Sequence, residues 1–192
     1  MRVSRAQAAE NRENVIDVAS RLFREHGFDG IGLKDLMEGA GLTQGAFYKQ
    51  FDSKEDLVAE ASARAMECAT ARWSRAVAAN PEDPLGAVIG FYLSKGHRKE
   101  KAEGCPLVAL GADAARQSAD VKAPFEDGIR EHLGVLSRLL PKDDSGENRE
   151  KAMAILATMV GAVTLSRVVN DPRLAQSILD AAAESVREAA SS

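Results

Sequence analysis

Apolar residues recur at intervals of three and four along most of the chain, which is the spacing of one face of an α-helix. The first such segment runs from about Ala8 to His26 and ends at Gly27, a residue type commonly found just past a helix C-terminus. A short second helix is expected from Leu33 to Ala40. After a brief glycine-containing break, Thr43 is expected to cap a third helix.

The rest of the chain also predicts helices, separated by proline, glycine and charged segments. The expected helices start at or near Ser53, Pro84, Pro106, Pro124, Glu147 and Pro172. The polar run from His97 to Gly104 is predicted to be a loop, and Pro141 to Asn148 a charged linker. Aromatic residues make up only 5% of the chain and Ala recurs in helical contexts, so the predicted fold class is all-α.

Charge, apolar runs and cysteines favour a protein of the reducing cytoplasm. The net charge is −4, and residues 1–54 carry eight Lys or Arg against eight Asp or Glu, so no basic excess indicates nucleic acid. The longest stretch without a charge, Ala152 to Ser166, is about 15 residues, whereas a membrane-spanning helix needs roughly 20. No apolar leader segment is visible, so export is not expected. Cys68 and Cys105 lie far apart, and neither a disulfide nor a zinc site is expected.

The three N-terminal helices match the helix-turn-helix unit, in which the helix after the tight turn enters the major groove of DNA. Phe47 and Phe51 lie four residues apart and are expected to face inward. The residues left on the outer or N-terminal side of the third helix are Thr43, Gln44, Gly45, Tyr48 and Lys49. Gln can pair with adenine, Thr and Lys can contact bases or phosphates, and glycine lets the backbone approach closely.

Two further lysines are expected beside the DNA backbone. Lys34 starts the second helix and Lys54 starts the fourth, where their ammonium groups would contact phosphates and fix the orientation of the protein. The alternative is a three-helix bundle that only packs, and it offers no reason for an exposed polar third helix.

The segment GIGLKDLMEGAGLTQGAFYKQFDSKEDLVAEA resembles the signature of the TetR family of bacterial transcription regulators. The likeness covers about Val15 to Ala61, and it departs at Gly32, where the family commonly has a Ser or Thr cap. It implies a dimer of about nine helices per chain, whose C-terminal domain binds a small effector and changes the separation of the two DNA-binding heads through the fourth helix. We therefore expect a DNA-binding domain at 1–54 and an effector-binding and dimerisation domain at 55–192.

The last two helices carry more apolar surface than one side of a helix needs. Covering this surface with a second copy of the chain would give a helical dimer seam. The predicted seam residues are Ile155, Met159, Ala162, Val163, Leu174 and Ile178. The alternative is that the first of these helices is fully buried in the core of a single chain.

Cys105 is the candidate thiol sensor, because it precedes Pro106 near a helix N-terminus, where the helix dipole favours the thiolate. A free cysteine is, however, usually a small buried hydrophobe, and this is what we expect for Cys68. An effector cavity could be lined by aromatic and flexible apolar side chains, which could also be ordinary core. The candidates for such a lining are Met66, Trp73, Phe91, Tyr92 and Leu107.

These observations favour a homodimeric regulator that binds a pseudo-palindromic operator in double-stranded DNA. Repression, with release by a small-molecule effector or by thiol modification, is what the resemblance implies. The alternatives are an effector-independent architectural DNA-binding factor and a small thiol enzyme in which His97 assists Cys105. No metal-ligand spacing or phosphate-binding loop is present in the sequence, so neither a cofactor nor an enzymatic activity is expected.

Overall fold

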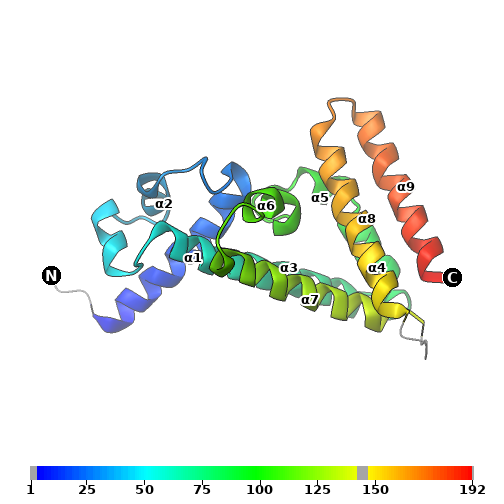
Figure 1. The fold of residues 1–192 in the computed structure, drawn as a ribbon, viewed down its shortest axis with the longest axis horizontal. Helices are drawn as coiled ribbons and strands as arrows, with labels where there is room; N and C mark the ends of the chain where they lie inside the picture. The colour runs from blue at the N-terminus through cyan, green and yellow to red at the C-terminus, as the bar shows by residue number, and fades with distance from the viewer. Residues whose placement is uncertain (1–3, 142–146, 192) are drawn as a thin grey trace.

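The computed structural model describes residues 4–141 and 147–191, and regular structure in these ranges consists of nine α-helices and one 3-10 helix, with no strand. The all-α prediction is confirmed (Figure 1). The elements are α1 Arg5–His26, α2 Leu33–Gly39, η1 Gln44–Lys49, α3 Lys54–Ala79, α4 Pro84–Tyr92, α5 Lys95–Lys99, α6 Pro106–Ala114, α7 Ala119–Leu139, α8 Asn148–Val168 and α9 Pro172–Ser191. Most of the predicted charged linker lies outside the described residues.

Short polar side chains cap most of the long helices, as their sequences indicate. The hydroxyl of Ser53 accepts a hydrogen bond from the backbone N–H of Asp56 at 3.0 Å, and Asp83 does the same for Gly86 at 2.9 Å. The Ser4 hydroxyl caps α1 in the same way and sets its start at Arg5. Gly27 ends that helix with φ of 78°, a left-handed conformation that favours glycine.

Two segments differ from the sequence prediction, one in where its helix starts and one in forming a helix at all, and a serine cap explains each. Ser118 caps α7, which therefore begins before Pro124, and the proline lies inside the helix. Residues 97–104, predicted to be a loop, begin within the short helix α5, because the Ser94 hydroxyl accepts a hydrogen bond from the N–H of His97 at 3.0 Å. The prediction overlooked both serines because prolines and charges dominate these segments.

The molecule is elongated, with a small helical head at one end and an antiparallel pair of helices at the other (Figure 1). α1, α2 and η1 form the head, α3 and α7 run side by side along the long axis, and α6 lies near the middle. α8 and α9 form the pair at the far end. Among the described helices, α8 is the one that is long and apolar enough to cross a membrane by length and composition, and here it packs on α7 and α9.

Buried apolar side chains form two clusters along this axis. The head cluster is built around Phe23, Phe28, Leu36, Met37, Phe47, Phe51, Leu57, Leu110 and Phe125. The C-terminal cluster is built around Trp73, Ile89, Tyr92, Leu136, Ile155, Met159, Val163, Leu179 and Val186. Leu107 of α6 packs against both clusters. Because the head cluster includes side chains of α3, α6 and α7, packing continues across residue 54.

Candidate DNA-binding face and effector-sensing region

The segment after the tight turn places one aromatic ring inside the head and the next one outside it. Phe47 is fully buried and stacks on Phe51, with ring centroids 5.4 Å apart. Tyr48 is 69% exposed and meets the Phe47 ring edge-on at 5.2 Å. The third helix is a 3-10 helix of six residues rather than an α-helix. Its glycine and two aromatic residues have low helix propensity, and the Thr43 side chain makes no capping hydrogen bond.

The other predicted DNA-reading residues share this outer surface. Thr43, Gln44, Gly45 and Lys49 are all exposed. A Cβ added at Gly45 would meet nothing within 4 Å, so the backbone here is open to a bulky partner. All five residues predicted to read DNA from this segment are therefore exposed, next to the buried pair of Phe47 and Phe51.

The two flanking lysines differ from each other. The Lys34 side chain is 70% exposed and lies 3.7 Å from Glu38 on the same helix. Lys54 instead directs its ammonium inward, where Nζ donates hydrogen bonds to the carbonyls of Phe28 at 2.6 Å and Ile31 at 2.8 Å. Lys54 thus holds the α1–α2 connection, a role that its position at the start of a long helix did not suggest.

Arginine side chains connect the head to α3. Arg12 pairs with Glu60 of α3, donates from Nε to the carbonyl of Gln50 at 3.2 Å, and lies over the Phe51 ring at 4.8 Å. The hydrogen bond with Glu60 raises the pKa of Arg12 above its usual value. Arg64 of α3 forms a second ionic link to the carboxylates of α1. The orientation of α1 on α3 is therefore set by charged groups at the edge of the head cluster.

Three arginines from different helices hold the segment 97–104. Arg24 of α1 is buried and donates to the carbonyl of Gly104 at 3.1 Å, and burial lowers its pKa. Arg72 of α3 donates to the carbonyl of Glu103. Arg167 of α8 donates to the carbonyls of His97 at 3.0 Å and Glu100 at 2.8 Å. The segment is thereby tied to the head, to the long axis and to the far helix pair.

His97 fixes the start of α6 from within the C-terminal cluster. Its Nδ1 lies 2.6 Å from the carbonyl of Tyr92, which can only accept, so Nδ1 carries the proton. Its Nε2 then accepts the backbone N–H of Cys105 at 3.0 Å. Burial lowers the pKa of His97, and the neutral ring is the form that satisfies both contacts.

Cys105 takes the buried environment that was the alternative to a sensor, and Cys68 departs from the core position expected of it. Cys105 is buried, and burial raises the pKa of its thiol, which opposes the thiolate that a sensor needs. Cys68, predicted to lie in the core, is exposed on α3. Its helix face is rich in small residues, and alanines on that face did not distinguish a buried position from a surface one.

The aromatic residues considered as an effector lining enclose almost no space. The void among Trp73, Phe91, Tyr92, His97 and Cys105 measures about 10 Å³. Trp73 instead fills the cluster, with the ring of His132 edge-on at 4.4 Å and that of Tyr92 at 5.6 Å. Larger grooves lie elsewhere on the surface, and Met66 and Leu107 contribute to them. Among the described residues, no three His, Cys, Asp or Glu side chains could hold a metal ion.

The predicted seam residues divide into two groups. Ile155, Met159, Ala162 and Val163 are buried within the protomer and belong to the C-terminal cluster. Leu174 is 48% exposed, and Ile178 is half-buried. The large apolar side chains exposed on α8 are Met153, Leu165 and Val168. Periodicity identified an apolar helix correctly but did not say which of its faces the chain covers by itself.

Comparisons with known proteins agree with the geometry of the head. Residues 15–61 match the family model of bacterial regulatory proteins of the tetR family. An HTH-type transcriptional regulator of Lactococcus lactis is 25% identical over 88% of this chain and 89% of its own length. The HTH-type transcriptional repressor NemR of Escherichia coli is 24% identical over 80% of this chain and 82% of its own length.

Solved structures share the whole fold. The reduced form of E. coli NemR superposes with a TM-score of 0.77, at 22% identity, over 93% of this chain and 96% of that one. A TetR-family regulator from Cytophaga hutchinsonii superposes with a TM-score of 0.81, at 18% identity, over 100% of this chain and 97% of that one. Residues 15–61 therefore match the DNA-binding domain of the tetR family, and the chain as a whole shares the fold of TetR-family regulators.

Proposed function

We propose that this protein is a cytoplasmic, homodimeric repressor that binds a pseudo-palindromic DNA operator and leaves it when a small molecule binds to the C-terminal half. Repression is supported by relatives such as NemR, which is described as a repressor. We assign DNA binding to residues 1–54 and sensing and dimerisation to 55–192.

The observation that carries this proposal is the exposed polar face of η1. Tyr48, Gln44 and Lys49 project from a segment whose buried rings fix its position in the head. In the major groove Gln44 would pair with a base edge, while Tyr48 and Lys49 would contact base or phosphate. Lys34 would add a phosphate contact from the start of α2, whereas Lys54 supports the head from inside.

The proposed dimer seam uses the apolar side chains that the single chain leaves uncovered. On α8 these are Leu165 and Val168, and on α9 Leu174 and Ile178 follow one helical face. The buried side chains of α8, such as Met159, then support the seam from beneath. A twofold axis through this face would place two heads on half-sites separated by about 34 Å or a multiple of it.

The thiol route remains an alternative to a small-molecule effector. Because Cys105 is buried and Cys68 is exposed, a maleimide should label Cys68 first in the folded protein. Mass spectrometry of peptides after timed labelling would measure both rates. Labelling of Cys105 as fast as that of Cys68 would favour the thiol route, because it would require a reactive, accessible thiolate.

Selection of bound sequences from a random DNA pool tests the proposal. An enriched inverted repeat at a stated near-physiological salt concentration is the expected result. Lys49→Ala should then weaken binding to that repeat, whereas Lys99→Ala should not, since Lys99 is also an exposed lysine but lies at the end of α5. Absence of enrichment, or equal loss in both variants, would contradict sequence-specific binding through η1.

A further inference from the structure

A surface groove between α6, α7 and α8 has two adjoining parts that share Leu107, Ile129 and Leu133. The part beside α8 has a volume of about 370 Å³, and all its lining residues are apolar, including Met153 and Leu156. The part beside α6 has a volume of about 440 Å³ and reaches Phe125. Both volumes fall in the range of about 300–1,000 Å³ that is typical of small-molecule sites.

Charged groups gather at one part of the groove only. Lys122, Arg130 and Arg149 line the part beside α6, together with a single acidic residue, Glu126. Glu126 is paired with Arg130 on the same helix. Two positive charges therefore remain uncompensated at this part, whereas the part beside α8 has none, so the groove is apolar at one end and cationic at the other.

We propose that this groove binds a small amphipathic anion, with an apolar chain or ring beside α8 and a carboxylate or phosphate near Lys122 and Arg149. The assignment rests on the proposed function, because it identifies the effector site of that regulator. A second groove, between α3 and α7, has a similar volume of about 430 Å³ but is lined by four acidic residues, Glu60, Glu67, Asp127 and Glu131. The same anion would be repelled there, so the charges of the lining residues favour anion binding in the groove between α6, α7 and α8.

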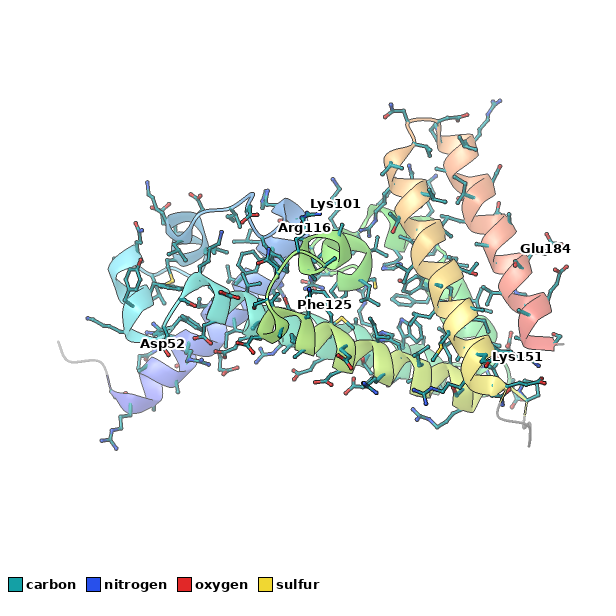
Figure 2. The ribbon with its side chains drawn as sticks, viewed as in Figure 1. Asp52, Lys101, Arg116, Phe125, Lys151 and Glu184 are labelled. Carbon is teal, nitrogen blue, oxygen red and sulfur yellow. The ribbon has the colours of Figure 1, made fainter. Side chains whose placement is uncertain are left out.

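The groove touches both hydrophobic clusters, so occupancy can reach the DNA-binding head. Phe125, labelled between α6 and α7 in Figure 2, belongs to the head cluster, and Leu156 belongs to the C-terminal cluster. α6 also contacts the end of α1, where the Asp113 carboxylate accepts the N–H of Phe28 at 3.4 Å. A ligand that separates α6 from α7 and α8 would therefore act on the orientation of α1.

Titration calorimetry of the full chain without DNA tests the site. Decanoate and decyl phosphate are the probes, with decanol as the uncharged and decyltrimethylammonium as the oppositely charged control. Both anions should bind at least about tenfold more tightly than decanol, a difference of about 1.4 kcal/mol. Equal binding of decanol, stronger binding of the cation, or no binding of either anion would overturn the proposal.

Two glycine variants separate the groove from the rest of the surface. A Cβ at Gly111, which lines the groove, meets nothing within 4 Å, and the same is true at Gly90 on α4, outside the groove. Gly111→Leu should fill the groove and abolish decanoate binding, while Gly90→Leu should leave it unchanged. Lys122→Gln with Arg149→Gln should weaken decanoate binding by about tenfold and leave decanol binding unaffected.

Two further outcomes for the Gly111 variant would also contradict the proposed anion site. Unchanged decanoate binding in Gly111→Leu would overturn the proposal, and so would a Gly111→Leu protein that becomes monomeric in sedimentation, because a second copy would then cover the groove. Calorimetry contains no DNA, so its failure would leave the operator selection untouched. A failed operator selection would likewise leave a positive calorimetric result standing.

Discussion

The two hydrophobic clusters differ in the kinds of side chain that build them. The head cluster is built of aliphatic side chains, phenylalanines and methionines, and the buried polar side chains of its helices α1 and α3 are Ser20, Arg24 and Ser62. The C-terminal cluster contains Trp73, Tyr92 and Cys105 and encloses His97 and His132. Within the described residues, four side-chain atoms are buried without a hydrogen-bond partner: the Tyr92 hydroxyl and His132 Nε2 in the C-terminal cluster, and Gln50 Oε1 and Ser62 Oγ closer to the head.

This difference matches the tasks proposed for the two regions. A DNA-binding head must present η1 in one orientation, and close packing of the aromatic and aliphatic side chains of its cluster favours a single arrangement. The C-terminal region is held by hydrogen bonds that several helices make to one segment, 97–104, and such contacts can be exchanged when a ligand binds. The comparison predicts large packing effects in the head and smaller, pH-sensitive effects in the C-terminal half.

The largest expected effect comes from removing an apolar anchor of the head. Phe47→Ala should lower the free energy of unfolding by about 3–5 kcal/mol, because the ring is fully buried and stacks on Phe51. Tyr48→Ala, at the adjacent exposed position, should change it by no more than about 0.5 kcal/mol. Denaturant unfolding of both variants measures these free energies. Equal losses of stability would show that Phe47 is no more important to the packing of the head than the exposed Tyr48.

The second effect concerns the arginine that links the head to segment 97–104. Arg24→Met should cost about 1–3 kcal/mol, because the buried carbonyl of Gly104 loses its donor. Arg21→Met is the matched control, since Arg21 contacts Glu103 of the same segment from the surface and should cost under about 1 kcal/mol. Thermal unfolding and amide exchange of residues 97–104 would report both. Similar losses of stability in the two variants would mean that the buried contact of Arg24 stabilises the fold no more than the surface contact of Arg21.

The head was largely predictable from the sequence because its signals are local. Gly27 and Ser53 mark element boundaries by their own chemistry, and the spacing of Phe47 and Phe51 predicted that both are buried. The inward direction of Lys54 was not predictable, because its carbonyl partners are more than 20 residues away in the chain. The same limit applies to Arg12, whose partner Glu60 belongs to another helix.

The C-terminal half was predictable only as a set of helices. Its apolar pattern identified α8 and α9, yet Met159 and Val163 proved to face the interior, while Leu165 and Val168 are exposed. An amphipathic pattern fails to orient a helix that is apolar on most sides, because two different partners can cover it. The contacts of His97 and Arg167 join residues far apart in the chain, which no periodicity encodes.

The third effect is a loss of stability on acidification that originates in the C-terminal cluster. Burial lowers the folded-state pKa of His97 and His132 below the usual 6.5. The unfolded chain therefore binds more protons below about pH 6.5, and stability that is complete above this pH should fall as the pH drops toward the folded-state values. His132→Leu should flatten this decline in denaturant unfolding at a series of pH values. His26→Gln, at an exposed position on α1, should not, and an equal change would place the effect outside the cluster.

The smallest expected effect tests the unpaired hydroxyl directly. Tyr92→Phe should leave the free energy of unfolding nearly unchanged or raise it by about 1 kcal/mol, because a buried hydroxyl without a partner costs free energy in the folded state. The ring contact with Trp73, at 5.6 Å, is kept. A loss above about 1 kcal/mol in denaturant unfolding would show instead that the hydroxyl is bonded in solution. The neighbouring Cys105 thiol would be the partner to test, by a double-mutant cycle with Cys105→Ala, and coupling in that cycle would make the polar groups of this cluster a connected network.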